Sequence, residues 1–322
     1  MKGRPDMPSD HAPDFSVVII NYNGAAYLAV CLGGLDQQTM PQERYETILL
    51  DNASADRSLE LVRSAFPRVH LLPQSRNTGF AEGNNIAVGA ARGKFIVLLN
   101  NDTIPDPFWL EELERAIAEN PGCVVGSKLV MAGEPDRINS AGLCLLRDGR
   151  GADRSYGERD VGQCEAGGEV FAACAAAVAI PRALLRRPLF DPTYFLYCED
   201  LEEGWAGRLA GRRTVLAPRA VVRHIVGASA GDRSPLFWYH VERNRTLTAL
   251  RHGDPFLMAY SCGGLLVRAA RASLMALRRH PAPKYRWPTV VSIWRALGDV
   301  LLRAPGILTE RWTAPARLRG RA

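Results

Sequence analysis

The segment Phe95–Thr103 combines a run of five apolar residues with an abrupt polar end, Asn100, Asn101 and Asp102. Such a run is typical of a buried strand that carries a carboxylate to its C-terminal end. In open α/β sheets ligands bind beyond the carboxyl ends of the strands, and hard divalent cations prefer carboxylate and phosphate oxygens. The pattern therefore predicts Asp102 as a metal ligand.

Polar clusters also follow the two preceding apolar runs. The segment DNAS at 51–54 comes after the second run, and RNTGFAEGNN at 76–85 comes after the third. Three consecutive strand ends thus carry polar side chains to one edge of the predicted sheet. The turn NYNG at 21–24 lacks the GxGxxG glycines, and no GxxxxGK[ST] motif occurs, which excludes a dinucleotide fold and a P-loop.

A second acidic centre is the pair Glu199 and Asp200, which follows the aromatic run Tyr194–Tyr197. Two acids at the start of a helix are favoured by the helix dipole alone. A carboxylate beside a hydrophobic wall also has a raised pKa, which suits a general base at neutral pH. The residues by themselves leave both interpretations open.

Alternating strand and helix patterns lead to these residues. Short apolar runs at Ser16–Ile20, Thr47–Leu50, Val69–Leu72 and Lys94–Leu99 are separated by segments with helical spacing. Such strands, joined by helices, predict an α/β fold with a parallel sheet that is covered on both faces. Pro107–Glu119 predicts a further helix with proline near its first turn.

The second half of the sequence has other patterns. Met131–Gly168 is rich in Gly, Asp and Arg, which indicates a hairpin and a variable loop, whereas the apolar run Val170–Ile180 is expected to return to the core. Leu201–Ala210 and Pro235–Leu250 are expected to be helices. After Pro255 the sequence becomes helical, apolar and basic.

Composition indicates a globular protein with a basic end. Of 322 residues 47% are hydrophobic, which is enough for one large core or two modest ones. Residues 251–322 hold thirteen Lys/Arg against three Asp/Glu, which leaves 27 against 31 for residues 1–250. The seven cysteines show no paired spacing and residues 1–14 contain no apolar signal segment, so we expect reduced thiols and a cytoplasmic location.

The motifs taken together resemble a known family over Phe15–Leu250. VVIINYNG, DNAS, RNTGFAEGNN, LLNNDT and FLYCED occur in the order found in inverting family 2 glycosyltransferases of GT-A fold, particularly the rhamnosyltransferase-like branch of bacterial surface polysaccharide synthesis. The resemblance implies a Rossmann-like, mostly parallel central sheet flanked by helices. Amphipathic helices would follow this sheet at the C-terminal end of the protein.

By this resemblance Asp51 would accept the N3–H of a uracil or thymine base, although Asp is also an ordinary turn residue. Arg76 and Asn77 would line the sugar or phosphate side of the nucleotide, or else form a solvated loop. Three further residues of the matching segments are assigned to substrate binding: Asn21, Gly79 and Asn85.

The resemblance places Asn100-Asn101-Asp102 where the family has its metal-binding DxD motif, of which only the last carboxylate is present. Asp102 would still hold Mg²⁺ or Mn²⁺, because donor phosphates and waters can complete the shell. Asn101 would contact the donor sugar. His224 is assigned as a second metal ligand, although a lone histidine beside a strand is also typical of a core residue.

The same resemblance assigns the general base to Asp200, with Glu199 in support; Glu202 or Glu203 is an alternative base. Arg243, on the predicted helix Pro235–Leu250, would neutralise the leaving diphosphate near the mouth of the site or else belong to a solvated basic face.

The expected activity is transfer of a sugar, with inversion, to a hydroxyl of a glycan or lipid-linked oligosaccharide. The resemblance favours dTDP-L-rhamnose as donor, then UDP-hexoses, then GDP-mannose. The reduced number of carboxylates at 100–102 also fits a catalytically silent nucleotide-sugar-binding or scaffolding subunit.

The expected domains are a disordered tail (1–14), a catalytic domain (15–250) and a basic amphipathic helical region (251–322). Arg268 and Arg271 interrupt Phe256–Leu277, so no span of 18 apolar residues remains. With three tryptophans (287, 294 and 312) and the basic string at 317–321, the region is expected to lie on anionic lipid at the inner face of the cell membrane, or to be a packed helix pair. Nucleic acid is not expected as a partner.

Overall fold

The computed structural model describes residues 12–186, 188–225 and 234–313. Four N-terminal strands form the parallel half of the central sheet: β1 (Phe15–Asn21), β2 (Tyr45–Asp51), β3 (His70–Pro73) and β4 (Phe95–Leu99). Their order is β3-β2-β1-β4, and each neighbouring pair is parallel. The predicted strands and their parallel arrangement are therefore confirmed.

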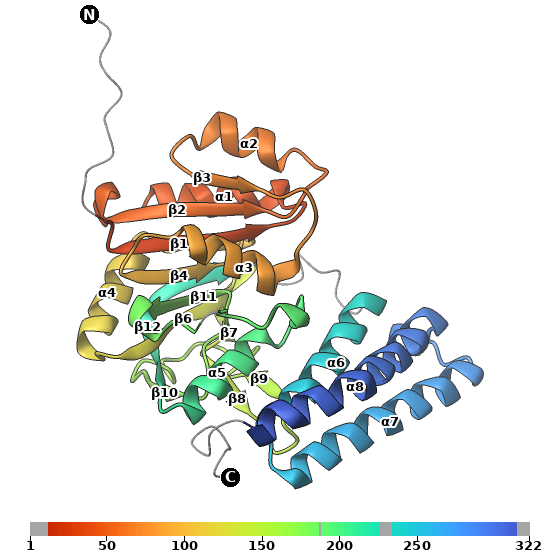
Figure 1. Ribbon diagram of the computed structural model, residues 1–322. Coiled ribbons are helices and arrows are strands. Elements are labelled where there is room, and N and C mark those ends of the chain that lie inside the picture. The colour runs from red at the N-terminus through yellow and green to blue at the C-terminus, as the bar shows by residue number, and fades with distance from the viewer. Residues whose placement is uncertain (1–11, 187, 226–233, 314–322) are drawn as a thin grey trace, which may run out of the picture.

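The sheet continues with antiparallel partners. β11 (Ala177–Pro181) pairs antiparallel with β4 and with β6 (Cys123–Met131), and β12 (Arg213–His224) runs parallel to β6. Beyond it lies the short strand β10 (Gly168–Val170), while β5 (Thr103–Pro105) pairs with the end of β12. The result is a mixed sheet in which β12 ends beside the segment that follows β4 (Figure 1).

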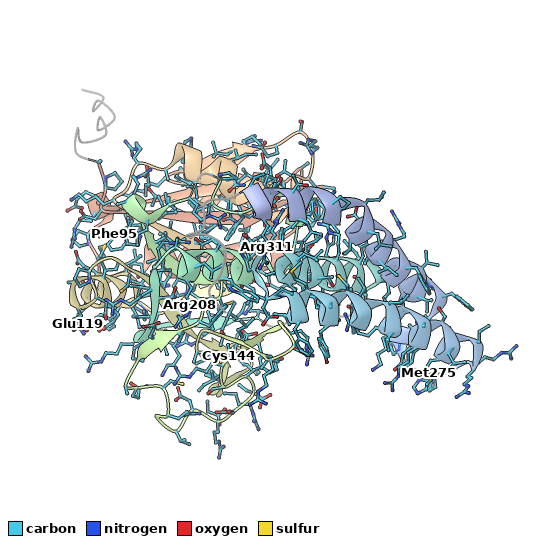
Figure 2. All side chains as sticks on the ribbon, turned by 60° about the horizontal axis from the view of Figure 1, so that its bottom comes forward. Phe95, Glu119, Cys144, Arg208, Met275 and Arg311 are labelled. Carbon is cyan, nitrogen blue, oxygen red and sulfur yellow. The ribbon has the colours of Figure 1, made fainter. Side chains whose placement is uncertain are left out.

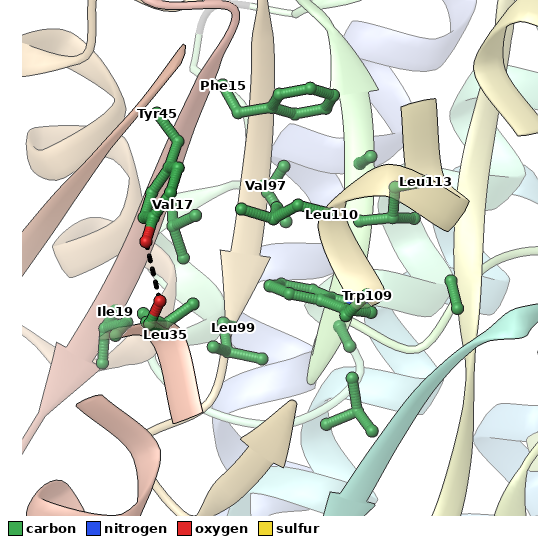
Figure 3. Close-up of a cluster of buried hydrophobic side chains, with 14 of the residues drawn as sticks. Phe15, Val17, Ile19, Leu35, Tyr45, Val97, Leu99, Trp109, Leu110 and Leu113 are labelled. Atoms are coloured by element: carbon green, nitrogen blue, oxygen red, sulfur yellow. Dashed lines mark hydrogen bonds between the residues drawn. The ribbon is translucent and has the colours of Figure 1, made fainter. Parts of the chain in front are cut away.

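Helices cover both faces of the sheet. α1 (Ala25–Asp36) and α4 (Trp109–Glu119) share one apolar cluster with the β1 residues Val17 and Ile19, whereas α3 (Gly79–Ala90) shares the opposite cluster with Val18. This alternation follows from the two-residue period of a strand. Figure 3 shows the first cluster, where the Tyr45 hydroxyl donates to the carbonyl of Leu35 at 2.7 Å. α2 (Ser58–Ala65) flanks the β3 edge.

The segment between β6 and β11 is more ordered than its composition predicts. It contains β7 (Glu134–Ser140) and the hairpin of β8 (Leu143–Leu145) with β9 (Gly151–Asp153). Ile138 and Ala141 lie in a small core of their own. The hairpin was predicted, but the core was not, because its few apolar residues are far apart in the sequence.

Three helices form an arm beside the sheet (Figure 1): α6 (Pro235–His252), α7 (Pro255–Leu277) and α8 (Trp287–Thr313). Leu247 and Leu250 of α6 pack with Leu265 of α7 and Val290 of α8. The expected domain boundary after residue 250 falls in the last turn of α6. Among the described residues, no helix combines the length and the hydropathy of a membrane span.

Candidate active site

A cavity of about 240 Å³ lies at the carboxyl edge of the parallel strands. Side chains after β1, β2 and β4 form one wall, and the segment before α5 (Glu199–Leu209) forms the other. Six of the predicted site residues line it: Asn77, Gly79, Asn101, Glu199, Asp200 and His224. The tertiary structure therefore brings together residues that are far apart in the sequence.

A larger cavity, about 780 Å³, lies on the other side of α5. Four of its polar side chains contact one another in two pairs: Arg251 pairs with Asp191, and His252 binds Glu202 at 2.8 Å. Arg212 pairs with Glu203. Both alternative bases are thus engaged in ion pairs away from the smaller cavity, which holds the candidate chemistry.

A buried polar network ties three strand ends together. Asn21 Nδ2 donates to Asp51 Oδ1 at 2.8 Å, and Asn101 Nδ2 donates to Asn21 Oδ1 at 2.8 Å. Asp51 also accepts from the backbone N–H and the hydroxyl of Ser54, at 2.9 and 2.6 Å. A Cβ atom on Gly24 would lie 2.2 Å from Asn101 Nδ2, so this turn has no room for a larger residue.

Asp51 itself is fully buried and is not among the residues that line the cavity. A carboxylate has about four acceptor positions, and these three hydrogen bonds leave capacity for one more. Its contact with a nucleotide base stays a prediction.

Asp102 and His224 meet where β5 pairs with β12. His224 lies opposite Thr103 in this ladder, and its Nε2 is 3.3 Å from Asp102 Oδ1. The other ring nitrogen, Nδ1, is 2.8 Å from Asn139 Oδ1, so the ring is held from both sides. The two predicted metal ligands are therefore neighbours in space.

This donor set fits a divalent cation that keeps several exchangeable ligands. Within residues 12–186, 188–225 and 234–313 no three His, Cys, Asp or Glu side chains cluster as a metal site. Asn100 Oδ1, at the same strand end, is buried without a hydrogen-bond partner among the described residues. A carboxylate, an imidazole and an amide oxygen are ligands that Mg²⁺ or Mn²⁺ would accept, with waters in the remaining positions.

Glu199 and Asp200 open α5 and face the cavity. Asp200 accepts from the backbone N–H groups of Leu201 at 2.8 Å and Ala175 at 3.3 Å. Glu199 Oε2 is buried and has no hydrogen-bond partner in the part of the protein that the structure describes. Burial raises the pKa of both carboxyl groups, and each is further raised by a neighbouring carboxylate.

Two polar residues of this region were missed by the sequence analysis, Asn139 and Asp153. The Asp153 carboxylate, from β9, is the next largest cause after burial of the raised pKa of Asp200. Burial raises the pKa of Asp153 too, while a hydrogen bond with Ser140 and then the nearby His224 act in the opposite direction. No local motif marks these residues, because they reach the site only through the folding of the segment between β6 and β11.

The segment Tyr194–Cys198, which we call the strap, has an unusual backbone. Three of its non-glycine residues have positive φ angles: Phe195 (63°), Tyr197 (69°) and Cys198 (65°). Such angles are unfavourable for L-residues and persist only where the surroundings enforce them. The carbonyl of Phe195 accepts from Phe80 N–H at 2.6 Å, and a Cβ on Gly79 would lie 2.5 Å from the Phe195 ring.

Side chains of α6 hold the strap through hydrogen bonds to its carbonyl groups. Asn244 Nδ2 lies within hydrogen-bond distance of three strap carbonyls, those of Tyr194 (2.9 Å), Leu196 (2.9 Å) and Tyr197 (2.7 Å). Arg243 donates to the carbonyls of Thr193 and Tyr194. Arg243 is only 4% exposed and is not among the residues that line the cavity, so the structure places it under the strap rather than at the mouth of the site.

The remaining predicted residues lie in different places. Arg76 is exposed and outside the cavity lining. Asn77 lines the cavity, and its side chain accepts from Gly79 N–H at 2.8 Å. Asn85 exchanges hydrogen bonds with the backbone of Phe190, at 2.8 and 3.0 Å, and is not part of the lining.

Comparison with known proteins shows the family of this chain and its fold. Residues 16–186 match the family model described as "Glycosyl transferase family 2". Glycosyltransferase AglE of Haloferax volcanii is 30% identical over 120 residues, which are 36% of this chain and 40% of AglE. Succinoglycan biosynthesis protein ExoO of Rhizobium meliloti is 34% identical over 113 residues, 34% of this chain and 31% of ExoO. The match thus spans at most two fifths of the length of these curated relatives.

Solved structures share the fold over nearly the whole sequence. The structure of S. aureus TarS 1–349 in complex with UDP has a TM-score of 0.55 at 18% identity and covers 92% of this chain and 84% of that one. The mannosyltransferase PcManGT from Pyrobaculum calidifontis, in complex with GDP-Man and Mn²⁺, has a TM-score of 0.53 at 18% identity, with 91% and 88% coverage. These likenesses show the GT-A-like fold.

Proposed function

Because the chain belongs to glycosyl transferase family 2, we propose that it transfers a sugar from a nucleotide sugar to a hydroxyl group of a glycan or a lipid-linked oligosaccharide. The observation that carries the proposal is one cavity lined by Glu199 and Asp200 on the strap side and by His224 at the strand ends. Asp102 is 1% exposed and is not part of this lining, but its Oδ1 lies 3.3 Å from Nε2 of His224.

The arrangement divides the chemistry between two walls. An acceptor hydroxyl in the cavity would pass its proton to Asp200, whose raised pKa makes it a stronger base than a solvated carboxylate. Glu199, beside it, would position the acceptor. With no enzyme nucleophile between donor and acceptor, a single displacement inverts the anomeric carbon.

The donor would lie against the strand ends. Asn101 and Asn77 line the cavity on this side, and the buried Asn21 and Asp51 lie behind Asn101 in the hydrogen-bonded network. Asp102 and His224, with Asn100 near them, would hold Mg²⁺ or Mn²⁺. A bound divalent cation supplies positive charge for the departing diphosphate.

We infer L-rhamnose from dTDP-rhamnose as the transferred sugar, with hexoses of UDP-sugars as the second choice. The motif series between Phe15 and Leu250 supports this inference. Related structures were solved with UDP, with UDP-GlcNAc and with GDP-Man, so the fold itself accommodates several donors. The proposed setting is polysaccharide synthesis on the inner face of the cell membrane, with residues 15–250 catalytic and residues 251–322 in contact with anionic lipid.

The test is calorimetric binding of a donor panel (dTDP-rhamnose, UDP-glucose, UDP-galactose, UDP-N-acetylglucosamine and GDP-mannose) with and without Mn²⁺. Wild-type protein should bind one donor in a metal-dependent way, and Asp102→Ala should lose this dependence. Asp106→Ala is the matched control, since it removes a carboxylate four residues further along that accepts from Phe108 N–H at 3.2 Å. Equal binding by Asp102→Ala and wild type would contradict the assigned metal site.

A catalytically silent nucleotide-sugar-binding or scaffolding subunit is the second candidate, favoured by the single carboxylate at 100–102. The two candidates differ in turnover. Release of nucleoside diphosphate from the bound donor, with or without an acceptor, identifies an enzyme. Donor binding with no turnover under any acceptor condition identifies the silent subunit.

A further inference from the structure

Helix α7 is apolar on two opposite faces. One face packs in the arm through Ser261, Leu265, Ala269, Ala272 and Ala276. The other face is exposed, and we call it the outer stripe. Its members recur every third or fourth residue: Phe256, Tyr260, Gly263, Val267, Ala270, Leu274 and Leu277.

The exposure of the outer stripe is large for a surface that faces water. Phe256 is 77% exposed, Val267 65% and Leu277 69%, with Tyr260 and Leu274 at about half. The helix has 23 residues, so the stripe runs roughly 34 Å along the arm. A continuous apolar surface of this kind marks an interaction site.

Tryptophans of α8 extend the same surface. Trp294 donates its indole N–H to Ser273 Oγ of α7 at 2.9 Å, which places it beside the outer stripe. Trp294 is 42% exposed, and Val291 and Trp287, one and two turns before it, are about half exposed. Tryptophan favours the boundary between lipid headgroups and acyl chains, because its ring is apolar and its N–H is polar.

The charge on α7 and the first half of α8 selects the partner. Residues 255–298 contain seven Lys or Arg and no Asp or Glu, and of these cations Arg268 pairs with Glu242 of α6. Arg271 and Arg278 are exposed on α7 and at its C-terminal end. A surface that joins apolar side chains to cations without acids is complementary to an anionic lipid surface.

We propose that the outer stripe of α7, with Trp287 and Trp294, is the face by which this protein docks on an anionic membrane, with α7 lying along the headgroup boundary. The residues of the outer stripe are also separated alternately by four and three positions, as in a coiled coil. A second copy of α7 is therefore the competing partner for this surface. Two copies would bring their arginines together with no acid to pair them, which disfavours that occupant.

Docking through α7 also ties the membrane to the candidate site. α6 packs against α7 and holds the strap through Asn244, so the lipid-facing helix and the acidic pair belong to one packed body. The inference deepens the proposed membrane location, and it does not depend on which sugar is transferred.

The experiment is sedimentation of the full-length protein with vesicles of phosphatidylcholine alone or with about one third phosphatidylglycerol, at low and high salt. We expect binding to the anionic vesicles only, weakened by salt. Val267→Glu with Leu274→Glu should lower the partition coefficient at least ~10-fold, since both replace exposed stripe residues with charges that lipid repels. Val161→Glu, at a strongly exposed apolar residue on the segment between β9 and β10, should bind like wild type.

A second pair of variants tests the charges. Arg271→Glu with Arg278→Glu should remove the preference for anionic lipid, whereas Arg63→Glu with Arg68→Glu, exposed on and just after α2, should not. Circular dichroism confirms that each variant is folded. The proposal is overturned if the stripe variant, Val267→Glu with Leu274→Glu, binds vesicles as well as the wild-type protein does. It is also overturned if the wild-type protein is a dimer that does not bind vesicles and the stripe variant is a monomer. Vesicle binding is measured without donor or acceptor, so its failure leaves the transferase proposal standing.

Discussion

Adjacent acids at the start of α5 have two separate sources of raised pKa. The first is burial against the strap and the sheet, and the second is the carboxylates around them, with Asp153 acting on Asp200 and Asp200 on Glu199. A helix N-terminus favours the charged form, yet here burial outweighs it. The arrangement favours a base that is poised near neutral pH rather than a simple helix-start acid.

The pH dependence of catalysis follows at this residue scale. Asp200 accepts a proton only when ionised, so kcat/KM should fall as the pH decreases through its raised pKa. Asp153→Asn removes a nearby negative charge, lowers the pKa of Asp200 and should move this acid limb to lower pH. Asp148→Asn, which breaks an ion pair with Arg150, is the control and should not move the limb. An unshifted limb in Asp153→Asn would show that Asp153 does not act on the base.

Removal of the proposed general base, Asp200, should greatly reduce activity. Asp200→Asn should reduce kcat by ~10²-fold or more while donor binding by calorimetry persists, since general-base catalysis contributes about that factor. Glu199→Gln should retain more activity and raise the acceptor KM. Retained turnover in Asp200→Asn would refute the assigned role.

The buried carboxyl group of Glu199 should also lower the free energy of unfolding. A carboxyl group whose pKa is higher in the folded than in the unfolded state destabilises the fold once the unfolded form ionises, above pH ~4, and this cost grows until the pH passes the folded-state pKa. Glu199→Gln should therefore raise Tm by roughly 1–2 °C per kcal/mol relieved, more at pH 8 than at pH 5. Thermal unfolding at both pH values measures it. A Tm gain that is equal at the two values would contradict the raised pKa.

At the scale of elements, the strap and α6 act as one unit. The positive φ angles at Phe195, Tyr197 and Cys198 are stabilised by hydrogen bonds that converge on Asn244, and by the close approach of Gly79. Arg243 adds a second layer of donors, and Asp299 of α8 accepts from Arg243 at 3.3 Å. Asn244 is thus a positioning residue: it holds the backbone that orients the acidic pair.

Asn244→Leu should separate this positioning role from general destabilisation. It leaves buried carbonyls without donors, at about 1–3 kcal/mol for each unsatisfied group, so Tm falls. Because the donor wall is on the opposite side, kcat should drop ~10-fold or more while the donor KM changes little. Asn120→Leu, which removes a similar amide-to-carbonyl bond at the end of α4, is the control and should keep kcat. If Asn244→Leu lowers Tm but leaves kcat unchanged, the role of Asn244 is structural only.

At the scale of the whole molecule, the arm is continuous with the catalytic body. Figure 2 shows Arg311 of α8 near the junction and Met275 of α7 at the far end of the arm. α6 contributes Leu247 and Leu250 to the core of the arm and Asn244 to the strap. The arm therefore supports the site as well as presenting the outer stripe.

Deletion of residues 253–322 tests this continuity. Removing α7 and α8 exposes the apolar side of α6 and takes away Asp299, which holds Arg243 and accepts from Tyr239 at 3.1 Å. The shortened protein should lose vesicle binding and also activity on a soluble acceptor, with a Tm lowered by several degrees. Full activity on a soluble acceptor would mean that the arm serves membrane contact alone.

The sequence alone determined what depends on local pattern. Apolar runs with turn residues marked the strands β1 to β4, and polar residues at their ends marked Asp102, Asn101 and Asn77, because parallel strands bring such ends to one edge. Local pattern also marked the acidic pair Glu199 and Asp200, since it follows an apolar run and opens a helix.

Only the tertiary structure decided what depends on contacts between distant segments. Asp153 and Asn139 reach the site from a region whose composition resembles a loop, and Arg243 lies under the strap because α6 packs there. The outer stripe and the inner face of α7 are both apolar, so helical spacing could not tell which one is covered. Burial is settled by neighbours far away in the sequence, and periodicity carries no information about them.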